Sequence, residues 1–248
     1  MNSIKIKVIN PDSGLTQEEL KSREMRLQKV ARPDTIISMV CPTKNNICID
    51  SMLDVALDAN EIIEMAIQAE QDGFDAVCLY CFSDPAIEAC RECLHIPVIG
   101  GGQVSVLIAA GLGNTFSILT TSKSRISQKK EFVRTLGVDY TRLASVRSIE
   151  FPVEQKEIEQ ANVIAALAEE AKRCVCEDHA DVVILGCLSF VGMAQEISTK
   201  VGVPVVDPGF ALVNMAELLV NQGLSHSKVS YPFPPKRERL WGSGNIKL

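Results

Sequence analysis

The sequence predicts an α/β protein with parallel sheets. Short apolar segments rich in Val and Ile alternate with segments of helical periodicity, and this alternation produces parallel strands joined by crossover helices. Two of these segments, residues 75–80 and 181–185, are almost continuously apolar, as strands covered on both faces of a parallel sheet are. The predicted strands span residues 4–9, 35–40, 75–80, 96–99, 116–119, 181–185 and 203–206.

Local start and stop signals place the helices of the first half. The turn Asn-Pro-Asp-Ser-Gly at residues 10–14 ends the first strand, and Thr16 with Glu19 three residues later has the form of a capping box. Gly73 is placed to end a helix as its C-cap, and Asp84-Pro85 to begin the next. We expect helices at about residues 16–30, 58–71 and 84–94, with an irregular loop at 41–51.

The second half repeats this order after three glycines at residues 100–102. These glycines match no phosphate-binding pattern and are expected to form a tight strand-to-helix turn or a close approach of backbone to a cleft. Helices are expected at about residues 127–136, 154–177, 192–201 and 208–221. The tail from Ser225 contains three prolines and is expected to be an irregular extension lying on the body or on a neighbouring subunit.

The two halves share a spacing that suggests an internal repeat. Asp75 stands six residues before Cys81, and Asp181 stands six residues before Cys187, so each cysteine closes an apolar strand. We therefore predict two similar Rossmann- or flavodoxin-like units related by a pseudo-twofold axis, with the active site between them. The predicted units are residues 1–100, completed by 209–248, and residues 101–208.

Composition limits the classes of function. The chain has 248 residues, 46% of them apolar, and a formal net charge of −6, so it is an ordinary globular protein and not a nucleic-acid binder. No apolar run is long enough to cross a bilayer, and the first ten residues lack the form of a secretory signal. The expected compartment is the cytoplasm, where the nine cysteines stay reduced.

Cys81 and Cys187 are the candidate catalytic groups. Ligands of open parallel sheets bind beyond the carboxyl ends of the strands, where both cysteines lie. Two opposed thiols can take a proton from one face of a carbon acid and return one to the other face, which inverts a stereocentre without a cofactor. A helix start beside each thiol would favour the thiolate. The other cysteines are expected to be packing residues: Cys41, Cys48, Cys78, Cys90, Cys93, Cys174 and Cys176.

Other chemistries have less support. Cys78-x-x-Cys81 and Cys90-x-x-Cys93 have zinc-like spacing, but residues three apart on a strand point to opposite faces, so no metal site is expected. No histidine flanks a strand-end cysteine, which disfavours a Cys-His pair. Short polar residues at two strand ends are either turn and cap residues or groups that hold a carboxylate, imide or ureido group: Asn10, Ser13, Thr120 and Thr121.

Several motifs together resemble the hydantoin and allantoin racemases of the aspartate/glutamate racemase superfamily. The segments that carry the resemblance are residues 10–13, 75–91, 118–121, 182–187 and 203–207. The resemblance implies a cofactor-independent racemase that forms homo-oligomers, with Cys81 and Cys187 as catalytic residues. It also implies a substrate held by Asn10, Ser13, Thr120 and Thr121 and by the backbone around each cysteine, at Phe82, Ser83, Gly186 and Leu188.

The sequence departs from the usual family pattern beside the second cysteine. Residues 186–193 read Gly-Cys-Leu-Ser-Phe-Val-Gly-Met, whereas the usual form is Gly-Cys-Ala-Gly-Met. The segment 41–51 and Ser13 also differ, and all three changes bear on specificity more than on acid–base chemistry.

The expected activity is racemisation of 5-substituted hydantoins or a related cyclic ureide. Related alternatives are an amino-acid racemase of the aspartate or glutamate type and a maleate-type cis-trans isomerase, while the presence of both cysteines disfavours an arylmalonate decarboxylase. A non-catalytic, small-molecule-binding α/β protein is the alternative from another class. The expected partner is a small-molecule substrate in a homo-oligomer, without nucleic acid or membrane.

Overall fold

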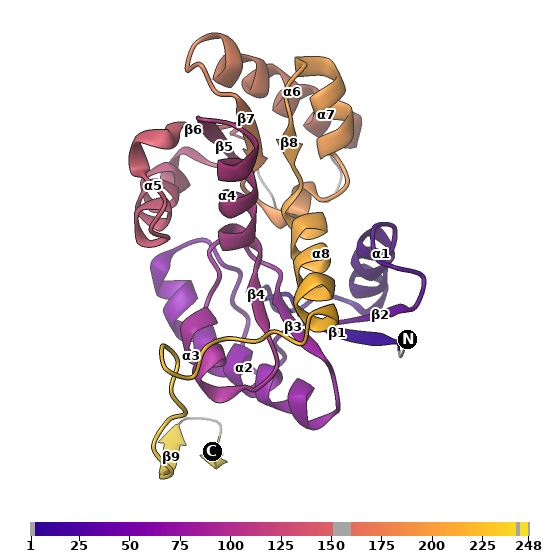
Figure 1. The fold of residues 1–248 in the computed structure, drawn as a ribbon, viewed down its shortest axis with the longest axis vertical. Coiled ribbons are helices and arrows are strands. Elements are labelled where there is room, and N and C mark those ends of the chain that lie inside the picture. The colour runs from indigo at the N-terminus through magenta and orange to yellow at the C-terminus, as the bar shows by residue number, and fades with distance from the viewer. Residues whose placement is uncertain (1–2, 151–159, 242–243, 248) are drawn as a thin grey trace. The chain divides into compact units, whose positions relative to one another are not determined.

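The chain forms two compact units, each of which is described by itself. The computed structural model describes residues 3–150, 160–241 and 244–247. The first unit runs to Gly100 and takes in the residues from Leu212 onward, and the second is Gly101–Ala211 (Figure 1). Among the described residues, no helix has the length and apolar character needed to cross a membrane.

The first unit is built on a four-stranded parallel sheet in the order β2-β1-β3-β4. Its strands are β1 Ile4–Ile9, β2 Thr35–Val40, β3 Ala76–Leu79 and β4 Val98–Gly100. All four residues of β3 are buried, as the continuously apolar sequence predicts for a central strand.

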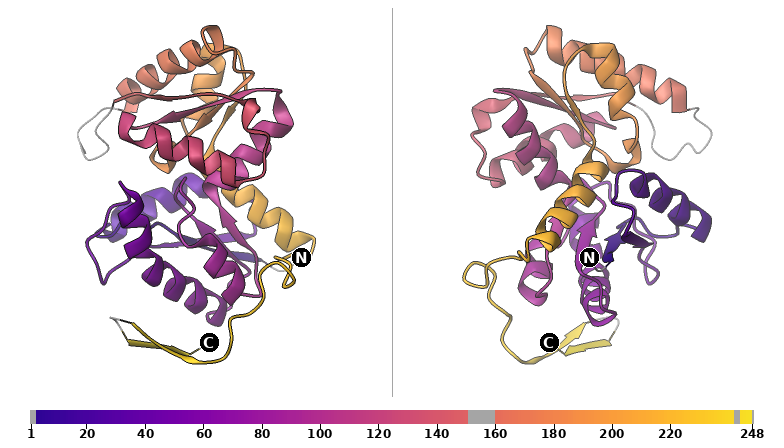
Figure 2. Two further views of the ribbon diagram at one scale, coloured as in Figure 1. Left: turned by 90° about the vertical axis from the view of Figure 1, so that its left-hand side faces the viewer. Right: turned by 45° about the vertical axis from the view of Figure 1, so that its right-hand side comes forward.

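Helices cover both faces of this sheet (Figure 2): α1 Gln17–Gln28, α2 Met52–Gln71 and α3 Ile87–Cys93. Apolar residues of α2 and α3 pack with Val77 and Leu79 of β3, while Cys78 points to the opposite face, where its Sγ lies 3.8 Å from the carbonyl oxygen of Leu212. The alternation of side chains along β3 thus divides the core into two layers.

Three helix starts test the sequence signals. The capping box of Thr16 and Glu19 is present at α1. The prediction that the next helix starts at residue 58 is wrong, because the Ser51 side chain accepts the backbone N–H of Asp54 and starts α2 at Met52. The prediction of a helix start at Asp84 is also wrong, since positive φ angles at Asp84 and Ala86 delay α3 to Ile87.

The second unit repeats the arrangement with the order β6-β5-β7-β8. Its strands are β5 Phe116–Thr120, β6 Leu143–Ser148, β7 Val182–Leu185 and β8 Val205–Val206. Strand β6 was not predicted, because this edge strand is mostly half-buried and partly polar and so lacks a continuous apolar run.

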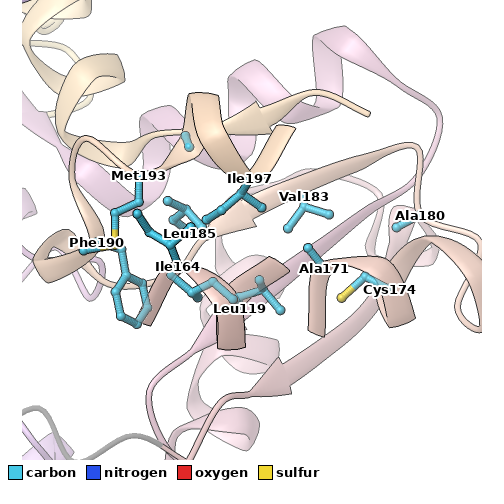
Figure 3. Packing of buried hydrophobic residues seen from close by; sticks show 12 residues of the cluster. Leu119, Ile164, Ala171, Cys174, Ala180, Val183, Leu185, Phe190, Met193 and Ile197 are labelled. Carbon is cyan, nitrogen blue, oxygen red and sulfur yellow. The ribbon is translucent and has the colours of Figure 1, made fainter. Parts of the chain in front are cut away.

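The helices of the second unit are α4 Gly101–Leu112, α5 Ile126–Thr135, α6 Gln160–Cys176 and α7 Ala194–Val201. Figure 3 shows the core in which Ile164 and Ala171 of α6 and Ile197 of α7 pack on Leu119 and Leu185. As expected, the chain passes from a strand to a helix at the glycines 100–102, since β4 ends at Gly100 and α4 begins at Gly101. The partly buried helix α4 itself was not predicted. Residues 154–159 of an expected helix lie outside the described residues.

Helix α8, Pro208–Asn221, starts in the second unit and continues in the first from Leu212. The tail then lies on its own unit: Lys228 Nζ donates to the carbonyl oxygens of Arg91, Glu92 and Leu94 near the end of α3. The expectation of a wholly irregular tail is wrong, because strands β9 Glu238–Trp241 and β10 Gly244–Lys247 pair antiparallel.

The two sheets therefore have one strand order. Strand β1 corresponds to β5, β2 to β6, β3 to β7 and β4 to β8. This confirms the predicted α/β class with two similar parallel-sheet units.

Candidate active site

Each sheet has a topological switch point between its two central strands. In the first unit β1 connects outward to β2 while β3 connects the other way to β4, and in the second unit β5 and β7 do the same. Ligands of such sheets bind at the carboxyl ends of the two strands that meet there. The residues that follow β1, β3, β5 and β7 are therefore the first candidates for a site.

Both candidate cysteines lie at these switch points. Strand β3 ends at Leu79 and β7 at Leu185, so Cys81 and Cys187 each stand two residues beyond their strand. Asn10 is the first residue past β1, and Thr121 the first past β5. The strand registers pair Ile9 with Leu79 and Leu119 with Leu185, so each thiol lies near the polar end of the neighbouring strand in its own unit.

The Cys81 thiol is half-buried in a tight turn. Its sulfur accepts the backbone N–H of Ser83 at 3.5 Å, and its carbonyl oxygen accepts that of Asp84 at 3.2 Å. Gly100 makes room for this turn, because a Cβ atom there would lie 2.3 Å from Cγ of Asp84. Phe82 is 2% exposed, so its side chain belongs to the core.

The Cys187 thiol is also half-buried, and it begins the short 3₁₀ turn η3, Leu188–Phe190. Its Sγ lies 3.0 Å from Oγ of Ser189. Gly186 before it is required by packing, since a Cβ atom would lie 2.6 Å from both Ile118 Cγ2 and the carbonyl oxygen of Leu119. The Leu188 side chain is buried.

The two thiols differ in their relation to helix starts. The predicted helix start beside Cys81 is wrong, because α3 begins six residues later, at Ile87. Cys187 directly precedes η3, although its side chain makes no capping hydrogen bond. A backbone N–H in a tight turn, that of Ser83, therefore adjoins the Cys81 thiol, while the Cys187 thiol lies against the Ser189 hydroxyl.

Asp207, which directly precedes α8, also fixes the loop beside Cys187. Its buried carboxylate accepts the backbone N–H of Gly192 at 2.6 Å, together with those of Gly209 at 3.0 Å and Phe210 at 3.2 Å. Burial raises the pKa of Asp207, while these hydrogen bonds act in the opposite direction. The loop with Cys187 is thus attached to the start of α8.

Asn10 is 1% exposed, and its amide is oriented by the protein itself. Arg23 of α1 donates from Nη1 to Oδ1 of Asn10 at 2.8 Å, and Nδ2 of Asn10 donates to the carbonyl oxygen of Asp12 at 3.2 Å. Arg23 was not predicted as a site residue, because it is one of several charged residues in a predominantly polar helix, although the structure half-buries it. One N–H of the amide remains available for a ligand.

Ser13 contacts the segment 41–51. Its backbone N–H and its hydroxyl both donate to the carbonyl oxygen of Ile47 at 2.9 Å. Asp12 accepts the backbone N–H of Ile49 at 3.1 Å. The loop after β1 therefore supports segment 41–51, and the Ser13 hydroxyl already has a protein acceptor.

Thr120 is the last residue of β5 and Thr121 follows it; they are 1% and 8% exposed. The Thr120 carbonyl oxygen accepts the backbone N–H of Ile149 at 3.1 Å, which continues the pairing of β5 with β6. Both threonines thus lie at the switch point with restricted side chains.

The remaining thiols fall into three groups. Burial raises the pKa of Cys90 to about 12 and that of Cys174 to about 11, and it raises the pKa of Cys78 further, so all three stay protonated as core residues. Cys41 is buried and Cys93 half-buried. The expectation of packing roles for Cys48 and Cys176 is wrong, because both are exposed.

The CxxC spacings do not assemble a metal site. Cys78 lies in the core within β3, whereas Cys81 lies two residues beyond the end of that strand, so the expectation that both stand on one strand is wrong. Within the part of the chain that the structure describes, no group of three or more His, Cys, Asp and Glu side chains is arranged to hold a metal ion.

Comparisons with known proteins agree with this geometry. Residues 6–216 match the family described as Asp/Glu/Hydantoin racemase. A hydantoin racemase of Pseudomonas sp. (strain NS671) is 34% identical over 244 residues, which cover 98% of this chain and 97% of that protein.

Solved structures give the same result. An allantoin racemase from Klebsiella pneumoniae superposes with a TM-score of 0.88 at 29% identity and covers 97% of each chain. One from Pseudomonas fluorescens has the same TM-score at 28% identity, with 96% of this chain and 100% of that one covered. The chain therefore belongs to the Asp/Glu/Hydantoin racemase family and is an isomerase of the racemase type.

Proposed function

We propose that the protein racemises 5-substituted hydantoins or a related cyclic ureide, without a cofactor. The observation that carries this proposal is the pair of matched cysteines, each two residues beyond a central strand at a switch point. The names of the hydantoin and allantoin racemases among its relatives support the substrate class.

The proposed mechanism uses the two thiols as an acid–base pair. In one direction the Cys81 thiolate removes the proton from the stereocentre, and the electron pair of the broken C–H bond delocalises into the adjacent ring carbonyl. The Cys187 thiol then delivers its proton to the opposite face of the same carbon, which leaves Cys81 as the thiol and Cys187 as the thiolate. The reverse reaction exchanges the two roles.

The residues around the thiols supply binding groups of the required kind. A cyclic ureide presents carbonyl oxygens and ring N–H groups, which need donors and acceptors respectively. Asn10, Thr120 and Thr121 supply both, and the backbone N–H groups near Ser83 and Leu188 stabilise the negative charge that develops on the ring oxygen. The hydroxyl of Ser13, which already bonds to Ile47, is assigned a supporting role.

The test follows each enantiomer of a 5-substituted hydantoin by circular dichroism in D₂O, with blanks that lack protein. Wild type should racemise either enantiomer and place deuterium at the stereocentre of the product. Cys81→Ser and Cys187→Ser should each abolish racemisation. Because each variant keeps one base on one face, each should exchange the stereocentre hydrogen of only one enantiomer, and the two variants should prefer opposite ones.

Two results would contradict the proposal. Racemisation at near wild-type rate by either single variant would remove the two-thiol mechanism. Wild-type turnover of aspartate, glutamate or maleate, with none of hydantoins or allantoin, would replace the substrate class. Cys90→Ser is a suitable control, because this thiol of α3 is buried in the core.

We also propose that the protein works as a homo-oligomer in the reducing cytoplasm. All nine of its cysteines are free thiols, two of them exposed, and an oxidising compartment would threaten these. Sedimentation of the native protein and cell fractionation test the two parts. A monomer at working concentration, or recovery from an oxidising compartment, would contradict them.

A further inference from the structure

The side chains of Cys187 and Ser189 are in direct contact. Sγ and Oγ lie 3.0 Å apart, and either atom can donate. When Cys187 is a thiolate it can only accept, so the Ser189 hydroxyl must then be the donor. Hydrogen bonds to an ionised acceptor are stronger than those between neutral groups.

The backbone fixes where this hydroxyl lies. Ser189 is the middle residue of η3, and the turn is closed by hydrogen bonds from Phe190 N–H to the Cys187 carbonyl oxygen at 3.2 Å and from Val191 N–H to that of Leu188 at 3.3 Å. The N–H of Gly192 beyond it is bound by the buried Asp207 carboxylate. The Ser189 side chain is exposed, but these hydrogen bonds hold the main chain on both sides of it.

The other half has the same spacing and a different contact. Cys81-Phe82-Ser83 and Cys187-Leu188-Ser189 are both Cys-x-Ser sequences. In the first unit the sulfur accepts the backbone N–H of Ser83 at 3.5 Å, whereas in the second it lies 3.0 Å from a side-chain hydroxyl. A substitution at residue 189 can therefore remove a hydrogen bond to the sulfur without altering the main chain.

We propose that Ser189 is a positioning residue for Cys187: its hydroxyl donates to the sulfur, stabilises the thiolate and directs the thiol proton away from the loop. When the sulfur holds a proton, continued donation from Ser189 leaves the S–H free to point at the substrate. The kinetic part of this inference rests on the proposed function, while the effect on thiol reactivity does not.

The test compares Ser189→Ala, which removes the hydroxyl, with Ser189→Thr, which keeps it. Iodoacetamide labelling at pH 7, followed by peptide mapping, gives the alkylation rates of Cys187 and Cys81 in one sample. A lost hydrogen bond of ordinary strength lowers the thiolate fraction about tenfold, and the greater nucleophilicity of a less stabilised thiolate restores about threefold. Cys187 in Ser189→Ala should therefore react about threefold more slowly, with Cys81 unchanged.

A second measurement, at higher pH, separates this role from a merely structural one. At pH 9.5, where more of the thiol is ionised, the rate deficit of Ser189→Ala should shrink or reverse, since its thiolate is the more nucleophilic. Ser189→Thr should stay within about twofold of wild type at both pH values. With a hydantoin substrate, kcat of Ser189→Ala should fall several-fold while KM stays within about twofold.

The outcomes distinguish the two proposals. If Cys187 in Ser189→Ala reacts at the wild-type rate, or if Ser189→Thr is as slow as Ser189→Ala, the role of the hydroxyl is overturned. If wild type turns over no hydantoin and yet the alkylation difference is present, the proposed function fails while the role of Ser189 in thiol reactivity stands.

Discussion

Asp58 should make the stability of the protein depend on pH in an unusual direction. This residue of α2 is fully buried; its Oδ1 accepts Nδ2 of Asn45 at 2.8 Å, and its Oδ2 has no hydrogen-bond partner among the described residues. Glu61 lies on the same side of the helix, and its Oε2 accepts the same Asn45 amide at 2.9 Å. Burial, with smaller contributions from Glu61 and Asp12, raises the pKa of Asp58 from 3.8 to about 6.

The magnitude follows from linkage. A carboxyl whose pKa is higher in the folded state binds more protons there, so its contribution to stability is greatest at low pH and is lost as pH rises from about 4 to about 6. A difference of this size corresponds to about 3 kcal/mol at neutral pH. Asp58→Asn removes the titration, so the variant should lack this loss.

Urea unfolding of wild type and Asp58→Asn at pH 4.5, 5.5, 6.5 and 7.5 measures the effect. The difference in unfolding free energy should grow in favour of the variant by about 2 kcal/mol across this range, because part of the total is already lost at pH 4.5. The new amide also places a donor at the unpartnered site, which adds an offset that does not change with pH. Asp50→Asn, at an exposed carboxylate, is the control; a variant that keeps the wild-type pH dependence would refute the reasoning for Asp58.

Three further substitutions test the scaffold of the site. Gly186→Ala should destabilise the second unit by about 1–3 kcal/mol in urea unfolding, because its Cβ has no room; a neutral effect would contradict the close packing. In Asp207→Asn the amide nitrogen cannot accept a hydrogen bond, so the contact to the backbone N–H of either Gly192 or Gly209 is lost. The variant should lower kcat and speed hydrogen exchange at Gly192, and unchanged exchange would contradict the role of Asp207 in fixing the loop. Lys228→Met should speed proteolysis of the tail, since Nζ no longer binds three carbonyl oxygens near the end of α3, whereas Lys236→Met is an exposed control.

The sequence predicted the central strands better than the helix ends. Strands β3 and β7 are short, apolar and buried on both faces, and such runs are rare outside parallel sheets. Strand β6 and helix α4 were missed for opposite reasons. The first is a partly polar edge strand, and the second starts with glycines whose low helix propensity is overcome by burial.

The candidate site shows the same division. Matched spacing alone placed Cys81 and Cys187 at corresponding strand ends, because a repeated βα unit brings equivalent positions to the same edge of each sheet. The partners of the polar residues were not predictable. The hydrogen bonds from Arg23 to Asn10 and from Ser13 to Ile47 join separate segments of the chain, so no local sequence pattern predicts them.

By itself, the sequence determined the α/β class, the two repeated units and the matching positions of Cys81 and Cys187 beyond two central strands, since hydrophobic periodicity and spacing are local properties of the chain. Only the tertiary structure decided which thiols are buried, which turn contains each candidate cysteine and which carboxyl groups have a raised pKa. These properties depend on desolvation and on hydrogen bonds between residues far apart in the chain. The contact between the Ser189 hydroxyl and the Cys187 sulfur likewise depends on the three-dimensional form of the turn that joins them.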